Sequence, residues 1–283
     1  MFYLKLLISI TIFYYCYADR SCDIKWPRCG TVENIVCRNG GTCKPDLNSD
    51  CVPIPNNNTF RDWIVEVHNC YRNRIALGEV QGVASAANMR VINYDLDLEY
   101  TASCSANLCK PQTDYCGRTK KFWQNGQNME IIHGGEDVIS SIPHRWFDNI
   151  RFMKPEGYRH YWKNLSLPLT FTQMIWAETT HIGCARAYSS KESKIVLVCN
   201  YGPPGNINLL PIYKAGEPVS KCPPGMHGNS EYRGLCGTVQ PVSTNRRITV
   251  KVRSGAVSVL KSNSIFALIC TIISCIHISI NII

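Results

Sequence analysis

The fold is decided by two sequence segments, Leu-Thr-Phe-Thr-Gln-Met-Ile-Trp (residues 169–176) and Cys-Asn-Tyr-Gly-Pro-Pro-Gly-Asn (residues 199–206). The apolar run Ile-Val-Leu-Val (195–198) leads into the second segment, and its Gly-Pro-Pro-Gly interrupts regular structure. An apolar run with such a breaker after it indicates a buried strand that leaves the core into an exposed turn. Cys184 and Cys199 would join two adjacent strands of a hairpin if they form a disulfide.

The sequence before this hairpin predicts helices. A first helix is expected after Thr59, which can cap it, and Gly78 is expected to end it. Residues 97–106 and 138–152 also have helical spacing, and Pro143 limits or kinks the last of these helices. The apolar positions of the first helix recur at steps of three or four residues: Phe60, Ile64, Val67, Tyr71 and Ile75.

The span from Thr59 to Asn206, about 150 residues, is long enough for one domain with its own core. Residues 122–132 fit either a short helix or a strand. Helices in the first half and strands in the second predict an α+β fold with helices packed on a sheet.

The N-terminal end has the pattern of a secretory signal peptide. Residues 1–18 contain one basic residue, Lys5, then an apolar core, and Cys16 and Ala18 before the expected cut. Residues 19–58 form a cysteine-rich, loop-like extension that needs disulfides to hold it against something larger.

The C-terminal end is apolar and uncharged over residues 265–283. Upstream lie a Pro/Gly-rich cysteine-containing extension (207–240) and a basic polar stalk (241–264) that includes the small triplet Ser254-Gly255-Ala256. Small residues, a polar spacer and an apolar tail match the signal for a GPI lipid anchor, which we assign to Ser254. The alternative is a retained tail that itself anchors the chain in the membrane.

The cysteine count indicates an oxidising compartment. Of sixteen cysteines, Cys16 leaves with the signal peptide and Cys270 and Cys275 lie in the tail, which leaves an odd number, thirteen, and therefore one unpaired thiol. The glycosylation sequons at Asn57 and Asn164 fit the secretory route. The net charge of +9 comes without a basic run interleaved with aromatics, so nucleic acid is not expected as a partner.

The two opening segments resemble the signatures of the CAP superfamily, which groups cysteine-rich secretory, antigen 5 and pathogenesis-related proteins. His68-Asn69, Arg72-Asn73 and the run 87–90 (Ala-Asn-Met-Arg) match its first helix and the following loop. The order and spacing agree over residues 59–206, and the cysteines before them resemble the arthropod venom allergen antigen 5 branch. The resemblance implies a three-layer α-β-α sandwich.

The resemblance also implies a set of disulfides: Cys22–Cys37, Cys29–Cys116, Cys51–Cys104 and Cys184–Cys199. A fifth bridge, Cys222–Cys236, is expected because the two cysteines are close in sequence. Cys43, Cys70 and Cys109 remain, and one further pair among them would leave one free thiol.

Many members of this family hold a divalent metal such as zinc with two histidines and two acidic residues. The four corresponding positions here are Leu108, Gln127, Asn149 and Thr170, so all four ligands are lost. We therefore expect no metal, no cofactor and no catalytic residue. A rebuilt site would have to use the remaining histidines of this region, with Glu130 and Glu136 as weaker candidates: His133, His144, His160 and His181.

The sequence thus predicts a non-catalytic extracellular or cell-surface protein that acts as a scaffold for binding a lipid, a sterol or a protein. Contact surfaces are expected at the aromatic loop 158–162 and at Phe152-Met153. One alternative is a secreted metal-dependent hydrolase with a rebuilt site. The other is a structural adhesion protein held at the membrane by the C-terminal anchor or tail.

Overall fold

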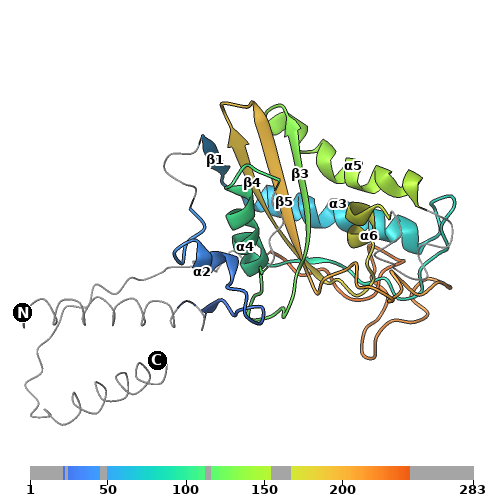
Figure 1. Cartoon of the computed structure of the whole chain (residues 1–283). Coiled ribbons are helices and arrows are strands. Elements are labelled where there is room, and N and C mark those ends of the chain that lie inside the picture. Colours follow the sequence, from blue (N-terminus) through green and yellow to red (C-terminus); the bar gives the residue numbers. More distant parts are fainter. Residues whose placement is uncertain (1–21, 23–24, 45–49, 112–115, 154–166, 243–283) are drawn as a thin grey trace, which may run out of the picture. The chain divides into compact units, whose positions relative to one another are not determined.

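A computed structural model describes residue 22 and residues 25–44, 50–111, 116–153 and 167–242 (Figure 1). The expected signal peptide, the apolar tail, Ser254, Asn164, His160 and the aromatic loop 158–162 lie outside these residues. In the described part of the chain, no helix is both long enough and apolar enough to cross a membrane.

One mixed sheet forms the middle of the molecule (Figure 1). Its strands are β1 (Cys51–Ile54), β2 (Asn93–Tyr94), β3 (Gly126–His133), β4 (His181–Ser189) and β5 (Lys194–Gly202). The strand order is β1-β4-β5-β3, with antiparallel pairing throughout, and the short β2 pairs parallel with the start of β4. The predicted hairpin is β4–β5, and residues 51–54, expected in the extension, supply an edge strand.

Helices cover both faces of this sheet, which gives the predicted α-β-α sandwich. The α-helices are α2 (Ile35–Arg38), α3 (Asn58–Ala76), α4 (Leu96–Ala106), α5 (Ser141–Asp148) and α6 (Leu169–Met174). Two 3-10 helices, η1 (Glu136–Val138) and η2 (Asn149–Phe152), flank α5. Helix α4 packs on β4 and β5, and α3, α5 and α6 lie on the other side of the sheet (Figure 1).

The sheet is buried on both faces, which explains why the run 195–198 is continuously apolar. Val196 and Val198 join Ala102 and Ala106 in the smaller core under α4. The alternate residues of β5 point into the larger core: Ile195, Leu197, Cys199 and Tyr201, with Trp146 and Phe171 from the helices.

The structure changes several local predictions. Helix α3 begins at Asn58, and its cap is Asn57 instead of Thr59, because the Asn57 carboxamide oxygen accepts from the Phe60 amide at 2.8 Å. Gly78 follows the helix with φ +71°, and this confirms the predicted stop. Pro143 lies in the first turn of α5, where its missing N–H costs no hydrogen bond.

The structure also decides between helix and strand for residues 122–132, because Gly126–His133 form strand β3. The first of the two opening segments starts as a helix, since residues 169–174 form the short helix α6.

Gly183 on β4 sets how closely α4 approaches the sheet. A Cβ atom at this position would lie 2.1 Å from the Glu99 amide nitrogen and 2.4 Å from the Asp95 carbonyl oxygen. Both of those atoms belong to the backbone at the start of α4, so neither can move without the helix. Only glycine allows this close packing.

Six disulfides connect the described cysteines. They are Cys22–Cys37, Cys29–Cys116, Cys43–Cys104, Cys51–Cys109, Cys184–Cys199 and Cys222–Cys236. Cys70, exposed on α3, is the one free cysteine of the described residues. Partial desolvation by neighbouring atoms, followed by the nearby carboxylates Glu66 and Glu231, raises the pKa of this thiol, so it is a weak nucleophile at neutral pH.

The expected Cys51–Cys104 pair is wrong, and the geometry of α4 explains why. Ala102 and Ala106, one turn apart, face the sheet and pack with Cys51. Cys104 lies midway between them in sequence and therefore on the opposite side of the helix, where it packs with Trp26. Cys104 pairs with Cys43 of the extension, and Cys51 reaches Cys109 beyond the helix end.

Arg72 of α3 is buried and binds the backbone of the segments that pack against the helix. Its guanidinium donates six hydrogen bonds of 2.8–3.3 Å to carbonyl oxygens, namely those of Arg90, Met174, Trp176, Ala177 and Thr179. Burial lowers the pKa of Arg72 to about 9, so the side chain stays charged at neutral pH.

We predict that Arg72→Met lowers the free energy of unfolding by about 3–5 kcal/mol, because it leaves several buried carbonyls without donors. Arg74→Met on the same helix is the matched control, since Arg74 is exposed and only stacks over Tyr71 and Phe147. The control should cost no more than about 1 kcal/mol. Urea unfolding at pH 7 measures both, and equal losses for the two variants would contradict the role given to Arg72.

Candidate functional site

The structure brings two of the four expected cleft positions into direct contact. The Asn149 carboxamide nitrogen, in η2, donates to the Thr170 hydroxyl of α6 at 3.0 Å. Both side chains are half-buried. This hydrogen bond joins η2 to α6 at the place where the resemblance expects an acidic residue and a histidine.

Gln127 of β3 makes its hydrogen bonds on the other side of the sheet. Its carboxamide nitrogen donates to Asn200 on β5 at 2.9 Å and to Ser105 on α4 at 3.4 Å. Gln127, Asn200 and Gly183 lie side by side in one row across the sheet, and Gly183 touches α4. Leu108 follows α4 and is half-buried. Gln127 and Leu108 therefore both lie on the α4 side of the sheet.

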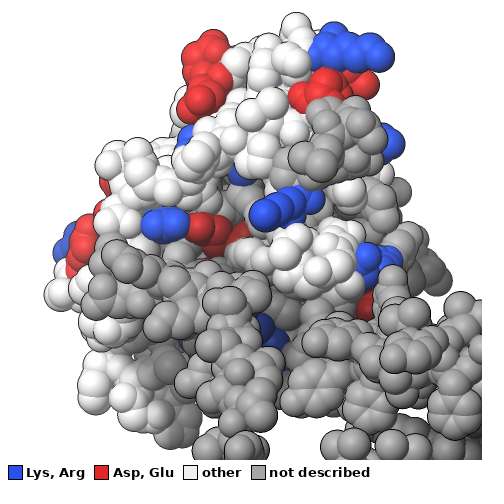
Figure 2. Space-filling model, turned by 90° about the vertical axis from the view of Figure 1, so that its left-hand side faces the viewer, with Lys and Arg blue, Asp and Glu red and all other residues white. Residues whose placement is uncertain are grey.

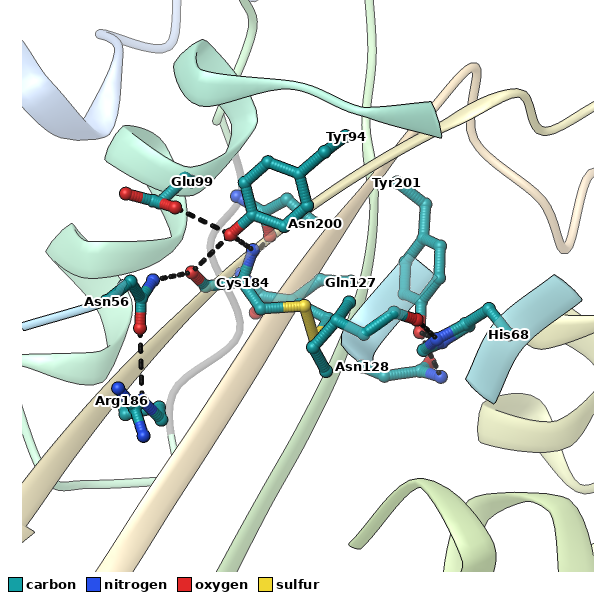
Figure 3. Close-up of a disulfide and its surroundings, with 12 residues drawn as sticks. Asn56, His68, Tyr94, Glu99, Gln127, Asn128, Cys184, Arg186, Asn200 and Tyr201 are labelled. Atoms are coloured by element: carbon teal, nitrogen blue, oxygen red, sulfur yellow. Dashed lines mark hydrogen bonds between the residues drawn. A yellow bond between two sulfur atoms is a disulfide. The ribbon is translucent and has the colours of Figure 1, made fainter. Parts of the chain in front are cut away.

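The neighbouring strand residue, Asn128, extends the polar network toward α3. Its carboxamide nitrogen donates to the Thr170 carbonyl at 2.9 Å and to the Tyr201 hydroxyl at 3.2 Å. Tyr201 in turn lies 3.0 Å from Nε2 of His68, as Figure 3 shows beside the Cys184–Cys199 disulfide.

His68 is fully buried and its tautomer follows from its partners. Nδ1 lies 2.8 Å from the Ile64 carbonyl, which can only accept, so Nδ1 carries the proton and Nε2 accepts from Tyr201. Burial lowers the pKa of His68 to about 4 and raises the pKa of Tyr201. His68 is therefore a structural hydrogen-bonding residue between α3 and β5.

The remaining described histidines do not gather into a second site. His144 contacts the Tyr71 hydroxyl, and His133 is exposed at the end of β3. His181 lies 2.8 Å from the Lys121 ammonium and 2.8 Å from the Thr180 hydroxyl. Burial, then Lys121, lowers the pKa of His181 to about 4.

The two acidic residues that the sequence offered for a rebuilt site, Glu130 and Glu136, are already paired. Glu130 accepts from Arg145 at 2.6 Å, and Glu136 lies 3.8 Å from Arg186. Glu99 of α4, which the sequence did not single out, receives one hydrogen bond of 2.6 Å from Tyr94 (Figure 3). It also receives two hydrogen bonds of 2.7 Å from Arg61. It therefore acts as a structural ion-pair partner between α3 and α4.

These residues do not fit a zinc ion. The cleft positions offer carboxamides, a hydroxyl and a leucine, whereas zinc requires imidazole, thiolate or carboxylate donors. Within the described residues, no three His, Cys, Asp or Glu side chains are grouped as metal ligands. We derive no metal-dependent step from this site.

The signature Gln173 has a positional role that spacing alone did not reveal. Its carboxamide oxygen accepts from the Gly205 amide at 2.9 Å, and its nitrogen donates to the Thr179 hydroxyl at 3.2 Å. A Cβ atom on Gly126 would lie 2.0 Å from this oxygen, and one on Gly205 would lie 2.8 Å from the nitrogen. The two glycines therefore make room for Gln173, which joins the end of α6 to the loop after β5.

Among the described residues on the face seen in Figure 2, basic and acidic side chains are interspersed and no extended area has one sign. Binding to a polyanion requires a continuous positive stripe. The described residues of this face do not provide one.

Comparison with known proteins agrees with the geometry. A family model described as "CAP: Cysteine-rich secretory protein family" matches residues 65–201. Scoloptoxin SSD976 of Scolopendra dehaani is 32% identical over 181 residues, which cover 62% of this chain and 83% of that protein. Venom allergen 5.02 of Dolichovespula maculata is 31% identical over 208 residues, which cover 70% of this chain and 95% of the other.

Among solved structures, that of NaASP2 with Zn2+ has a TM-score of 0.55 and 26% sequence identity. The match covers 69% of this chain and all of that one. Fold and matches together define a disulfide-bonded α-β-α sandwich protein. The chain belongs to the CAP family of cysteine-rich secretory proteins, and the two venom proteins place it in the arthropod branch.

We predict that His68 makes the protein less stable as the pH falls. The unfolded chain takes up a proton at its ordinary pKa of 6.5, whereas the folded state does so only at about 4. The contribution of His68 to the free energy of unfolding is therefore constant above pH 7 and declines between pH 6.5 and 4, by about 3 kcal/mol. Urea unfolding at pH 7 and pH 4.5 measures the decline, which His68→Gln should reduce. A parallel decline in variant and wild type would refute the assignment.

Proposed function

We propose that this chain is a secreted, non-catalytic CAP protein that acts as a binding scaffold for an apolar ligand such as a lipid or sterol. The observation that carries the proposal is the network at the cleft, where Asn149, Thr170 and Asn128 bind one another or the backbone. These groups are neutral at all accessible pH values, so they can neither activate water through a metal nor transfer a proton as acid and base.

The rigidity of the fold supports a scaffold role. Six disulfides tie the described part of the chain, and the extension is joined to α4 through Cys43–Cys104. A structure fixed in this way presents its loops without losing much entropy on binding. The proposed C-terminal lipid anchor or tail would hold the scaffold at the cell surface, and the signal peptide would direct it there.

An apolar surface near α6 supports an apolar ligand. We call Leu169, Ile207, Leu209 and Leu210 the leucine surface; their exposed fractions are 40–54%. Asn206 connects its two segments by donating to the Leu169 carbonyl at 3.0 Å. Leu209 has φ +68°, which costs an L-residue about 1–2 kcal/mol. Backbone strain of this kind is concentrated at functional sites, ligand-binding segments among them.

The contact surface expected at Phe152-Met153 is only partly exposed. Phe152 is 59% exposed under the Arg151 guanidinium, whereas Met153 packs against the core. Of these two residues, Phe152 alone is open to a ligand.

The absence of catalysis through a metal is tested by isothermal titration calorimetry with zinc chloride. We expect no binding in the micromolar range, because neutral carboxamide and hydroxyl oxygens are poor zinc ligands. NaASP2, whose structure contains Zn2+, is the positive control. Micromolar or tighter binding by this chain would favour the alternative, a metal-dependent hydrolase.

The ligand class is tested by extracting the purified, secreted protein with organic solvent and analysing the extract by mass spectrometry. We expect lipid or sterol to be recovered from the wild type, and to be lost from Leu209→Ser/Leu210→Ser. Val32→Ser, which changes an exposed apolar residue of the extension, is the matched control. If no lipid is recovered and a second protein co-purifies with this chain in a fixed ratio, the result would instead favour a protein partner or an adhesion role.

A further inference from the structure

Three consecutive asparagines, residues 56–58, connect β1 to α3, and the structure uses each side chain differently. Asn56 employs both ends of its carboxamide, since its nitrogen donates to the Cys184 carbonyl at 2.7 Å and its oxygen accepts from Arg186 at 3.0 Å. Asn58 is exposed, and its oxygen accepts from Arg61 at 3.2 Å. Asn56 is therefore fully occupied by the fold.

Asn57 uses only one end of its carboxamide. It has extended backbone angles (φ −106°, ψ 174°), and its oxygen caps α3 through the Phe60 amide. The residue is exposed, and the hydrogen bonds of the described residues include none from its nitrogen, Nδ2. Asn57 is also the one asparagine of the three with a hydroxyl two residues on, the exposed Thr59.

We propose that Asn57 carries an N-linked glycan on Nδ2 while its carboxamide oxygen continues to cap α3. Transfer forms a bond between Nδ2 and the anomeric carbon of an oligosaccharide carried on a lipid diphosphate. The bond from that carbon to the diphosphate oxygen breaks, and one Nδ2 proton leaves with the diphosphate. The product is a secondary amide that keeps its carbonyl oxygen, so the cap and the glycan do not compete.

The position gives the glycan a physical effect. Asn57 lies three residues beyond β1, which is the edge strand of the sheet and has Val52 56% exposed. An edge strand can pair with a second chain. A hydrated glycan beside this edge opposes such pairing.

The experiment uses the full chain secreted from a eukaryotic cell line. Peptide mapping by mass spectrometry, before and after treatment with an N-glycosidase, reports Asn57 separately from Asn164. We expect the wild-type peptide to carry a glycan at Asn57 and the Thr59→Ala peptide to be unmodified. Recovery of the wild-type Asn57 peptide without glycan would overturn the proposal.

Three variants then distinguish the effect of the helix cap on stability from that of the glycan, since none of them can be glycosylated at residue 57. Thr59→Ala and Asn57→Asp keep a capping oxygen, whereas Asn57→Ala loses it. We expect the first two to unfold at the same temperature and Asn57→Ala to unfold about 2–4 °C lower. Equal unfolding temperatures for all three would show that Asn57 does not cap the helix, and the proposed dual use would be wrong.

Discussion

The irregular segments that pack against α3 depend on one constraint, the burial of the Arg72 guanidinium. Residues 175–180 lie between α6 and β4 and belong to no helix or strand. Arg72 supplies donors to three of these residues and to the end of α6. Asn69 works in the same way, because its carboxamide pairs with both the amide and the carbonyl of Ile92. The signature residues of the first helix are therefore backbone partners for irregular segments, and this explains why they are polar although they are buried.

Much of the fold could be predicted from the sequence, because helix faces and the hairpin depend on local pattern. The apolar spacing of α3, its stop at Gly78 and the buried run of β5 are all visible in the chain. The helix cap and the Cys104 partner could not be predicted in this way. Asn57 and Thr59 both have capping side chains, and only the backbone angles decide between them. The partner of Cys104 depends on which side of α4 faces the sheet.

The residue types at the candidate site could be predicted from the sequence, whereas their arrangement in space could not. The prediction that the metal ligands are replaced rests on the identities of Gln127, Asn149 and Thr170 alone. Their arrangement depends on strand register, which places Gln127 opposite Asn200 on the α4 side and leaves Asn149 beside Thr170. The Asn149–Thr170 hydrogen bond joins η2 to α6.

The close contact at Gly183 also affects how the chain is oxidised as it matures. Helix α4 carries Cys104, and Cys109 follows its end, so the height of the helix above β4 fixes where both thiols lie. A larger residue at 183 would lift the helix and move these thiols away from Cys43 and Cys51. Wrong pairs would then compete with the native ones in the secretory pathway, and retention of misfolded protein would reduce its yield. A residue distant in sequence from the extension thus governs the fidelity of its disulfides.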